Sequence, residues 1–543
     1  MSQLRRLCAL VAVATVTVTG LTLVGSPAQA ATADPRPVSI GATWLEGQLT
    51  NGLLHYPDTG FGAYDDYGLS IDAGLSLHAV GGHDTAVTDV RNAIATAVGA
   101  GHYISGDEFG DTGSTYAGAV AKAAVFAKAA GGDPASFGGV NLVTRLEAQV
   151  STTAPNAGRL SDTSSFGDNA NTLGQAFAAN ALTAAGSAKA ASVVDFLLDQ
   201  QCSAGFFRLS FSAKAAPDQT CDAAGTASPD TDATAMAVLQ LFPITHAPGS
   251  PIALALAHAE TWLLAAQHAD GSFGGGTSTE SPNTNSTGIA GWALGVLGDD
   301  AAASKAAVWV RSHQADEPTA CPDALSTETG ALAYDDAALA AGRTDGITIQ
   351  TQDQWRRATA PTLPVLQWAP AATGTLDVDG PSDFVEAGTV ATVQVTGAAP
   401  GSRICVSGAG VARTSVAPAG GSFPVGLTMP AGTADRSVVV SDRAGSSAGV
   451  VLHVLGATTL RVTPARSTSH RGARLRVVVA GLAAGEHVAL KFRGTTVRSG
   501  TADAEGRFVR RFHVGRTLGK ARIVAVGEFP GIRRGRTVIR VVR

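Results

Sequence analysis

A short pattern recurs six times in the first two thirds of this 543-residue chain, and it limits the fold more than any other feature. In each copy an Asp or Asn is followed four residues later by Ser or Thr, and then by an apolar run rich in Ala and Gly. The copies begin at Asp66, Asp111, Asp168, Asp230, Asn283 and Asp323. Successive copies are 40 to 62 residues apart, which is enough for one antiparallel helix pair with its loops. The repeat therefore predicts an array of helix pairs.

The first residue of each copy is of the type that caps an α-helix. An Asp or Asn side chain accepts a hydrogen bond from a free N–H group of the first turn, and a carboxylate also complements the positive end of the helix dipole. The runs "TAMAVLQLF" and "STGIAGWALGVLG" contain the small residues that allow helices to pack closely. We expect the six residues to lie at the N-termini of six inner helices, all at one end of a closed double ring.

Two stretches resemble the squalene and terpene cyclases. "LLAAQHADGSFGGG", residues 263–276, resembles their Gln-x-x-Asp-Gly-Ser-Trp repeat, with Phe273 in the Trp position, and "PDTDATA" resembles their Asp-x-Asp-Asp-Thr-Ala acid motif. The corresponding place in other copies is marked by Gln48, Gln149, Gln201 and Gln314. The resemblance covers residues 40 to 360. It implies the (α/α)6 toroid that terpenoid cyclases share with the β-subunits of protein prenyltransferases.

The composition and the hydrophobic pattern of the sequence divide the chain into five segments. Residues 1–30 contain Arg5 and Arg6, an apolar run and a final Ala-Gln-Ala, which is typical of a signal peptide, with a retained membrane anchor as the alternative. Residues 31–362 are expected to form the toroid and residues 363–373 a linker. Short Val-rich alternating runs then predict two all-β immunoglobulin-like sandwiches, at 374–456 and 457–543. We expect a secreted bacterial protein, extracellular or associated with the cell envelope, without a stable transmembrane anchor.

Four cysteines follow the expected signal peptide: Cys202, Cys221, Cys321 and Cys405. Cysteines in a secreted protein commonly form disulfides. Cys202 and Cys221 flank a single loop, so joining them costs the least chain entropy, and we expect that bond. Cys321 and Cys405 then either pair across a domain boundary or stay free.

The acidic residues at the helix starts allow two different functions. As a polar rim around the mouth of the toroid they would hold a ligand by hydrogen bonds without catalysis. This expected rim comprises Asp66, Asp111, Asp168, Asp230, Asp232, Asn283, Asn285 and Asp323. The resemblance to class II terpene cyclases implies instead an isomerase or lyase in which Asp232 donates a proton to an alkene.

Other sequence features favour binding over catalysis. Ala233 replaces the next acid of the cyclase motif, and the inner runs contain about one aromatic residue each, whereas a cyclase stabilises cations with aromatic rings. The ligand in the toroid would be a small molecule or an extended surface polymer. A third possibility is a surface protein that binds another macromolecule. No cofactor is expected, and no metal, because the nearest zinc-like grouping, His313, Cys321 and Asp323, has the wrong order for a prenyltransferase site.

Charge is distributed unevenly along the chain. Residues 457–543 contain 19 Lys and Arg against four acidic residues, although the whole chain has a net charge of −5. This segment predicts attraction to an anionic polymer of the cell envelope. The alternative is a solvated strand face, with arginines at edge positions that prevent strand-to-strand aggregation. Nucleic acid is not an expected partner of a secreted protein.

Overall fold

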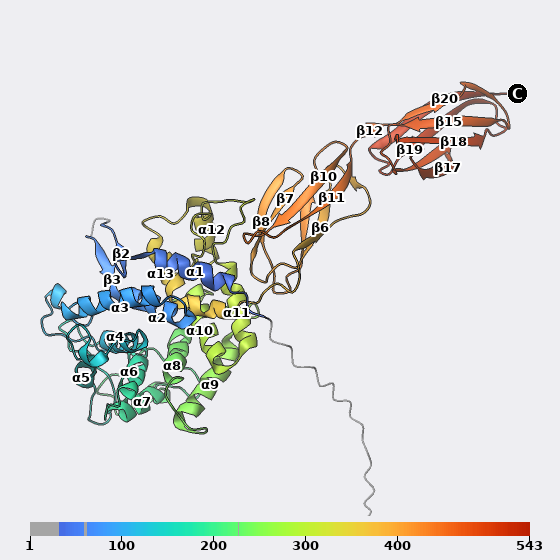
Figure 1. The fold of residues 1–543 in the computed structure, drawn as a ribbon. Helices are drawn as coiled ribbons and strands as arrows, with labels where there is room; N and C mark the ends of the chain where they lie inside the picture. The colour runs from blue at the N-terminus through green and yellow to red at the C-terminus, as the bar shows by residue number, and fades with distance from the viewer. Residues whose placement is uncertain (1–31, 59–61, 226) are drawn as a thin grey trace, which may run out of the picture. The chain divides into compact units, whose positions relative to one another are not determined.

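A computed structural model describes residues 32–58, 62–225 and 227–543, so the expected signal peptide lies outside the described residues. The described chain is mainly helical up to Trp368 and consists of β-strands from Asp377 onward (Figure 1). Of the helices in this part of the chain, none combines the length and the apolar character that crossing a bilayer requires. The switch from helix to strand follows the change from Ala-rich runs to alternating Val-rich runs.

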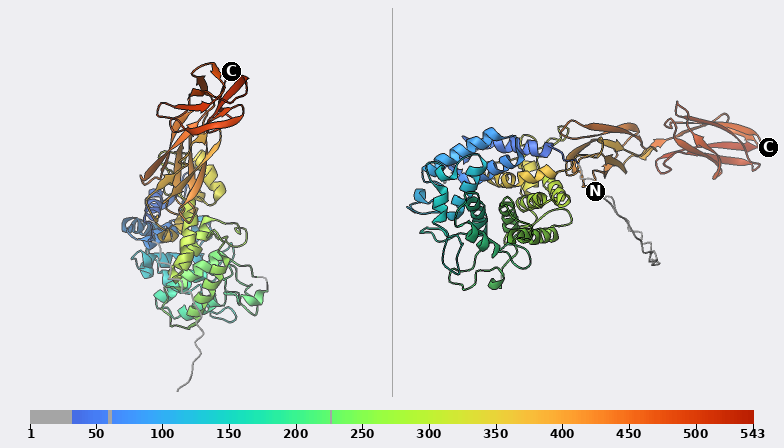
Figure 2. Two further views of the ribbon diagram at one scale, coloured as in Figure 1. Left: turned by 90° about the vertical axis from the view of Figure 1, so that its right-hand side faces the viewer. Right: turned by 60° about the horizontal axis from the view of Figure 1, so that its bottom comes forward.

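Six inner helices form a closed ring. Each packs against the next, and the last packs against the first, as can be followed in Figure 2. They are α2 (Tyr67–Val80), α4 (Ala117–Ala129), α6 (Thr172–Ala184), α8 (Thr231–Leu241), α10 (Thr284–Leu297) and α13 (Gln352–Thr362). The 3-10 helix η4 (Leu363–Trp368) continues from the last of them.

A second set of helices pairs with the inner ones. These outer helices are α1 (Arg36–Gly47), α3 (Asp84–Gly99), α5 (Leu142–Glu147), α7 (Ala190–Leu198), α9 (Pro251–Ala266) and α11 (Asp300–Ser312). The first pairs with α13, and each of the others pairs with the inner helix beside it in sequence. A further helix, α12 (Asp336–Asp345), and three short strands, β1 (Leu49–Thr50), β2 (Leu53–Tyr56) and β3 (Tyr64–Asp66), lie in the connections.

Close approach of small residues shows that the inner helices run parallel. Gly118 near the start of α4 lies against Gly174 near the start of α6. Further along, Asn180 of α6 donates a hydrogen bond to Gln240 of α8 (2.9 Å). Successive glycines of α10, namely Gly288, Gly291 and Gly295, face successive residues Thr362, Val365 and Trp368. The N-termini of these helices therefore lie at one end of the ring.

The Gln-x-x-Asp-Gly-Ser-Phe stretch is a structural connector. Gln267 Nε2 donates to the carbonyl of Ala302 in α11 (2.9 Å), and Gly271 has a φ of 95°. A Cβ on Gly271 would collide with the carbonyl oxygen of Lys305, also in α11. Two residues on, the N–H of Phe273 donates to Thr287 Oγ1 of α10 (2.9 Å). The stretch thus joins one outer helix to the next outer helix and to an inner helix.

The same geometry recurs around the ring. Left-handed glycines against an outer-helix carbonyl occur at Gly52, Gly158, Gly205, Gly271 and Gly330. The residue two positions later donates its N–H to an inner-helix side chain: Leu54 to Ser70, Leu160 to Gln175, Phe207 to Thr234, Phe273 to Thr287 and Leu332 to Thr359. Gln201 and Gln314 also donate to outer-helix carbonyls at 2.9 Å, as Gln267 does. Five of the six units therefore share one connector.

We expect Gly271→Ala to lower the free energy of unfolding by more than about 1 kcal/mol, because the new methyl group meets both a left-handed φ and the Lys305 carbonyl. The matched control is Gly298→Ala. Gly298 has a similar φ of 100°, but a Cβ there would meet nothing within 4 Å. Urea unfolding of both variants separates the backbone cost from the collision, and an equal loss in the two would contradict the role of close packing.

The first β region is a sandwich of two sheets around one core. One sheet has the order β5-β11-β10-β7-β8 and the other β4-β6-β9. Their bounds are β4 (Asp377–Asp379), β5 (Val385–Glu386), β6 (Val390–Thr396), β7 (Arg403–Gly408), β8 (Val411–Val416), β9 (Phe423–Thr428), β10 (Ala434–Ser441) and β11 (Ser447–Leu455). Alternate residues of the strands, such as Val393 and Val395, fill the space between the sheets.

The second β region repeats this arrangement. One sheet has the order β12-β20-β19-β16-β17, with β14 also paired to β20, and the other has the order β13-β15-β18. Their bounds are β12 (Thr458–Thr459), β13 (Arg461–Pro464), β14 (Thr468–His470), β15 (Arg474–Ala480), β16 (His487–Phe492), β17 (Thr495–Thr501), β18 (Arg507–His513), β19 (Gly519–Val526) and β20 (Arg533–Val542). The Arg-rich strand β20 has neighbours on both sides, so the expectation of arginines on an edge strand is wrong for it.

Two further expectations need correction. Residues 363–368 were expected in a linker, yet Leu363, Val365 and Leu366 are buried and η4 packs against α10 and α11. The sixth copy of the pattern, at Asp323, does not begin a helix. The next helix after it is α12, and the sixth inner helix starts only at Gln352.

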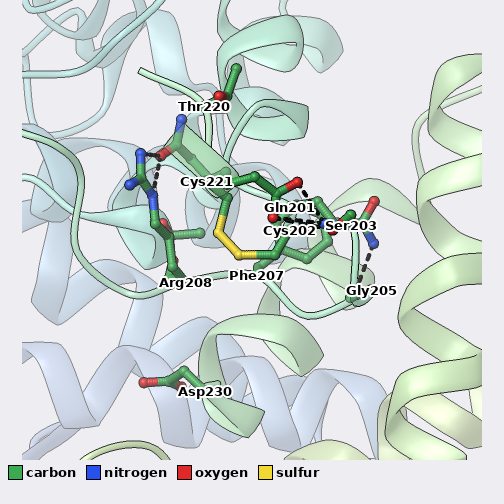
Figure 3. Close-up of a disulfide and its surroundings, with 12 residues drawn as sticks. Gln201, Cys202, Ser203, Gly205, Phe207, Arg208, Thr220, Cys221 and Asp230 are labelled. Carbon is green, nitrogen blue, oxygen red and sulfur yellow. Dashed lines mark hydrogen bonds between the residues drawn. A yellow bond between two sulfur atoms is a disulfide. The ribbon is translucent and has the colours of Figure 1, made fainter. Parts of the chain in front are cut away.

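Both pairs of cysteines are joined. The expected bond links Cys202 to Cys221 in the connection between α7 and α8 (Figure 3). Arg208 lies beside it and donates to Gln200 Oε1 (2.8 Å) and to the carbonyl of Gln219 (2.7 Å). The second bond links Cys321, after α11, to Cys405 in β7. Of the two possibilities for these cysteines, a disulfide between them or two free thiols, the structure shows the disulfide. Disulfides are typical of proteins outside the reducing cytosol.

Candidate binding cavity in the helical ring

Three of the six expected caps are found. The side chains of Asp66, Asp230 and Asn283 accept hydrogen bonds from first-turn N–H groups of α2, α8 and α10, at 2.8, 2.8 and 2.9 Å. In each case the pattern begins directly before the helix. The capping interpretation of these three residues is confirmed.

The other three positions are not caps. Helix α4 begins after Tyr116, and α6 begins after Asn171, which takes the capping role. Asp111 instead accepts from Ser164 Oγ (2.6 Å), and Asp168 pairs with Lys214 (2.8 Å). Asp323 pairs with Arg343 (2.7 Å). These carboxylates hold loops by local interactions, because the turns before α4 and α6 are longer than the repeat pattern assumed.

We expect Asp230→Ala to reduce the free energy of unfolding by about 0.5–2 kcal/mol through loss of the α8 cap. Asp230→Asn keeps an accepting oxygen at the same place, so it should lose much less. Denaturant titration of the two variants measures the difference. Equal destabilisation by Ala and Asn would show that the charge matters and the cap does not.

Asp232 and Asn285 occupy equivalent positions, each two residues after the cap of its helix. Asp232 Oδ1 and Asn285 Oδ1 are both buried without a hydrogen-bond partner among the described residues. Burial raises the pKa of Asp232 to about 6, the charge of Asp230 adds to this rise, and the Ser286 hydroxyl opposes it. Burial is therefore the main cause of the raised pKa of Asp232, and the neighbouring carboxylate adds less.

A central layer of six side chains crosses the ring at one depth. In five inner helices it is the sixth residue of the helix: Asp72, Lys122, Phe177, Met236 and Ile289. Pro361 of α13 completes the layer. Asp72 and Lys122 form an ion pair (2.7 Å), whereas the other four side chains are apolar. The layer is thus charged on one side and apolar on the other.

These six residues line a cavity of about 610 Å³, which also contacts the starts of α4 and α6. Tyr103, Tyr116, Asp162, Asn169 and Asn171 add polar groups to its wall. Small-molecule sites in proteins commonly have volumes of about 300–1,000 Å³ and a few polar groups in an apolar lining. The cavity therefore has the size and chemistry of a ligand site.

Tyr103 has a backbone conformation that is unusual for an aromatic residue. Its φ is 68°, in the left-handed region. Its ring lies against Gly68 at the start of α2, and burial, followed by the charges of Asp72 and Asp66, raises the pKa of its hydroxyl. Strained backbone at a cavity wall is often found where a side chain is held in position for a ligand.

None of the residues of the expected rim is among those that line this cavity. The sequence predicted three of the six inner-helix starts but not the central layer, which lies about one and a half turns further along the helices. Each of the five layer residues follows its cap by six positions, so counting from the caps would have found them. That count required the correct caps, Tyr116 and Asn171, in two of the helices.

No family model and no curated protein matches this chain. Among solved structures, the type II terpene cyclase MstE from Scytonema is 14% identical, covers 61% of this chain and 97% of its own length, and has a TM-score of 0.41. The Yersinia pseudotuberculosis adhesin InvE is 15% identical, covers 31% of this chain, and has a TM-score of 0.17. The Escherichia coli adhesin FdeC is 16% identical, covers 32%, and has a TM-score of 0.25. This chain spans 58% of the length of InvE and 66% of that of FdeC. Similarity at this level does not establish a shared activity.

Proposed function

We propose that the protein is a secreted binding protein whose helical ring is an (α/α)6 toroid followed by two immunoglobulin-like modules. The toroid holds a small amphiphilic ligand in its central cavity. The closed order of helix contacts and the connector shared by five units support this architecture. The two disulfides support a location outside the cytosol.

The observation that carries the proposal is the divided lining of the cavity. Phe177, Met236 and Ile289 offer an apolar surface, and Asp72 with Lys122 offers charged groups on the other side. Lys122 also donates to the carbonyl of Gly68 (3.0 Å), so its ammonium group is already oriented. A molecule with an apolar body and a polar or anionic end would satisfy both sides.

Native mass spectrometry of the mature protein, before and after exposure to a total lipid extract, tests the proposal. We expect a bound species with the wild-type protein and its loss in Met236→Trp, which fills the cavity. Leu254→Trp is the matched control, because Leu254 is 53% exposed on α9. An extract that gives no bound species, or binding that survives in Met236→Trp, would contradict a ligand site in the ring.

A second candidate is a terpene cyclase, favoured by the pKa of Asp232 near 6, which suits a proton donor. Against it, Asp232 does not line the cavity, and the only phenyl or phenol rings among the lining residues are those of Tyr103, Tyr116 and Phe177. Incubation with squalene and with geranylgeranyl diphosphate decides between the candidates. Cyclic product from the wild type, absent in Asp232→Asn, would establish the enzyme, whereas the binding proposal expects no product from either protein.

A further inference from the structure

The last sandwich carries an unusual distribution of charge. Residues 457–543 contain 17 Arg and 2 Lys, and their acidic residues are Glu486, Asp503, Glu505 and Glu528. None of the four acids lies in a strand of this region. The preceding sandwich, residues 374–456, contains six acidic residues and four arginines. The positive charge is therefore specific to one of two similar modules.

Both sheets of this sandwich carry basic residues at outward positions. On β13, β15 and β18 these are Arg461, Arg474, Arg476, Arg507 and Arg511, of which Arg507 pairs with Asp503. The outward positions of β16, β19 and β20 form what we call the basic face: Lys491, Lys520, Arg522, Arg534, Arg536 and Arg540. Five of these side chains are exposed and Lys491 is half-buried. In the described part of the chain none of the six forms an ion pair, and the two ion pairs of this region use Arg507 and Arg533.

The pairing of strands brings like charges together on the basic face. Lys520 lies directly opposite Arg540 in the β19–β20 ladder, and Arg522 lies opposite Val538 between Arg536 and Arg540. Like charges directly opposite each other on a sheet destabilise it. A bound polyanion would remove this repulsion, so the face gains more from an anionic partner than scattered charges would.

The residues between the charges indicate the chemistry of that partner. The outward positions of β19 and β20 hold Val524 and Val538, and β16 adds Ala489 and, at its start, His487. The outward positions of these strands hold no Phe, Tyr or Trp, so they offer no extended aromatic platform for sugar rings or bases. The planar guanidinium group of arginine can donate two parallel N–H hydrogen bonds to two oxygens of one phosphate group. Outward residues along a strand repeat about every 6.7 Å and follow the twist of the sheet, which suits a flexible chain better than a stiff one.

We propose that the basic face binds a polyphosphodiester polymer without bases, such as an anionic chain of the cell envelope. Each exposed arginine contacts a phosphate group of successive repeats. Contacts of this kind depend on charge, so their strength falls with ionic strength. This inference is independent of any ligand in the helical ring.

The test uses the full mature protein and immobilised synthetic poly(glycerol phosphate). We expect saturable binding that weakens steeply between about 0.05 M and about 0.5 M salt. The triple variant Arg522→Gln, Arg536→Gln, Arg540→Gln should bind roughly tenfold more weakly or worse, because it removes three of the exposed charge contacts with the polymer. Circular dichroism of the variant checks that the fold is retained.

The matched control removes the same charge from the opposite sheet: Arg461→Gln, Arg476→Gln, Arg511→Gln. These residues lie at outward positions of β13, β15 and β18. We expect this control to keep most of the affinity. Equal loss in both triple variants would overturn the assignment to the basic face. Binding to polygalacturonate or to single-stranded DNA as tight as to poly(glycerol phosphate) would overturn the proposed class of partner.

Discussion

Arg533→Leu is expected to destabilise the last sandwich by about 3–5 kcal/mol, because it leaves the carboxylate of Glu486 buried without its partner. Arg533 and Glu486 are almost fully inaccessible, with side-chain exposures of 1% and 0%. The guanidinium donates to both carboxylate oxygens at 2.6 Å and to the carbonyls of Gly456 (2.9 Å) and Gly481 (3.0 Å). Hydrogen exchange measured by mass spectrometry on peptides of residues 457–543 reports the local free energy of opening.

The neighbouring arginine provides the control for this prediction. Arg534 lies on the basic face and is exposed, so Arg534→Leu should change the opening free energy by less than about 0.5 kcal/mol. Arg533→Lys should lower the opening free energy almost as much as Arg533→Leu, because an ammonium group cannot donate to both carboxylate oxygens of Glu486 in parallel. The double variant Arg533→Met with Glu486→Gln should recover part of the loss. Arg533→Leu and Arg534→Leu behaving alike would refute the importance of the buried pair.

Asp232→Asn is expected to stabilise the protein at neutral pH by about 3 kcal/mol. The pKa of Asp232 is about 6 in the folded protein, against an ordinary value of 3.8. As the pH rises from about 4 to about 6, the unfolded chain loses this proton first, so the wild type becomes less stable relative to the Asn variant. Each pH unit in that window contributes about 1.4 kcal/mol.

Urea unfolding of the two proteins from pH 3.5 to pH 8 measures this difference directly. The curves should nearly agree at about pH 3.5, where the carboxyl is mostly protonated in both states, and separate up to about pH 6. Asp89→Asn, which removes an exposed carboxylate on α3, should not reproduce the separation. A difference that is constant with pH would show that folding leaves the pKa of Asp232 unchanged.

The helices and strands were largely predictable, because local rules decide them. The caps at Asp66, Asp230 and Asn283 stand directly before apolar runs. In the strands from Val390 to Val542, apolar residues that face the core alternate with residues that face solvent. The misplaced starts, Asp111 and Asp168, have the right residue type at the right spacing but sit in longer turns. At Asp323 the pattern falls in a loop whose conformation depends on the disulfide of Cys321 and on Arg343.

The candidate site was less predictable than the fold. Its central layer draws one residue from each of six helices, so it exists only once the ring closes. Lys122 and Asp72 are charged residues within otherwise apolar helices, and that anomaly was visible in the sequence. Their ion pair, and the apolar side chains opposite them, depend on helices that lie far apart along the chain.

The bond between Cys321 and Cys405 also determines how the molecule would respond to pulling. A force applied through the last sandwich reaches Cys405 in β7 of the first sandwich and passes through the disulfide to Cys321 in the helical region, 84 residues earlier in sequence. The enclosed segment contains α12, α13 and the first strands of the first sandwich, and it bears no tension while the bond is intact. At roughly 3.4 Å per residue, this segment has a contour length of about 280 Å, and it cannot be extended while the disulfide is intact. A protein held by its basic face would keep the closing helix of its ring folded under load.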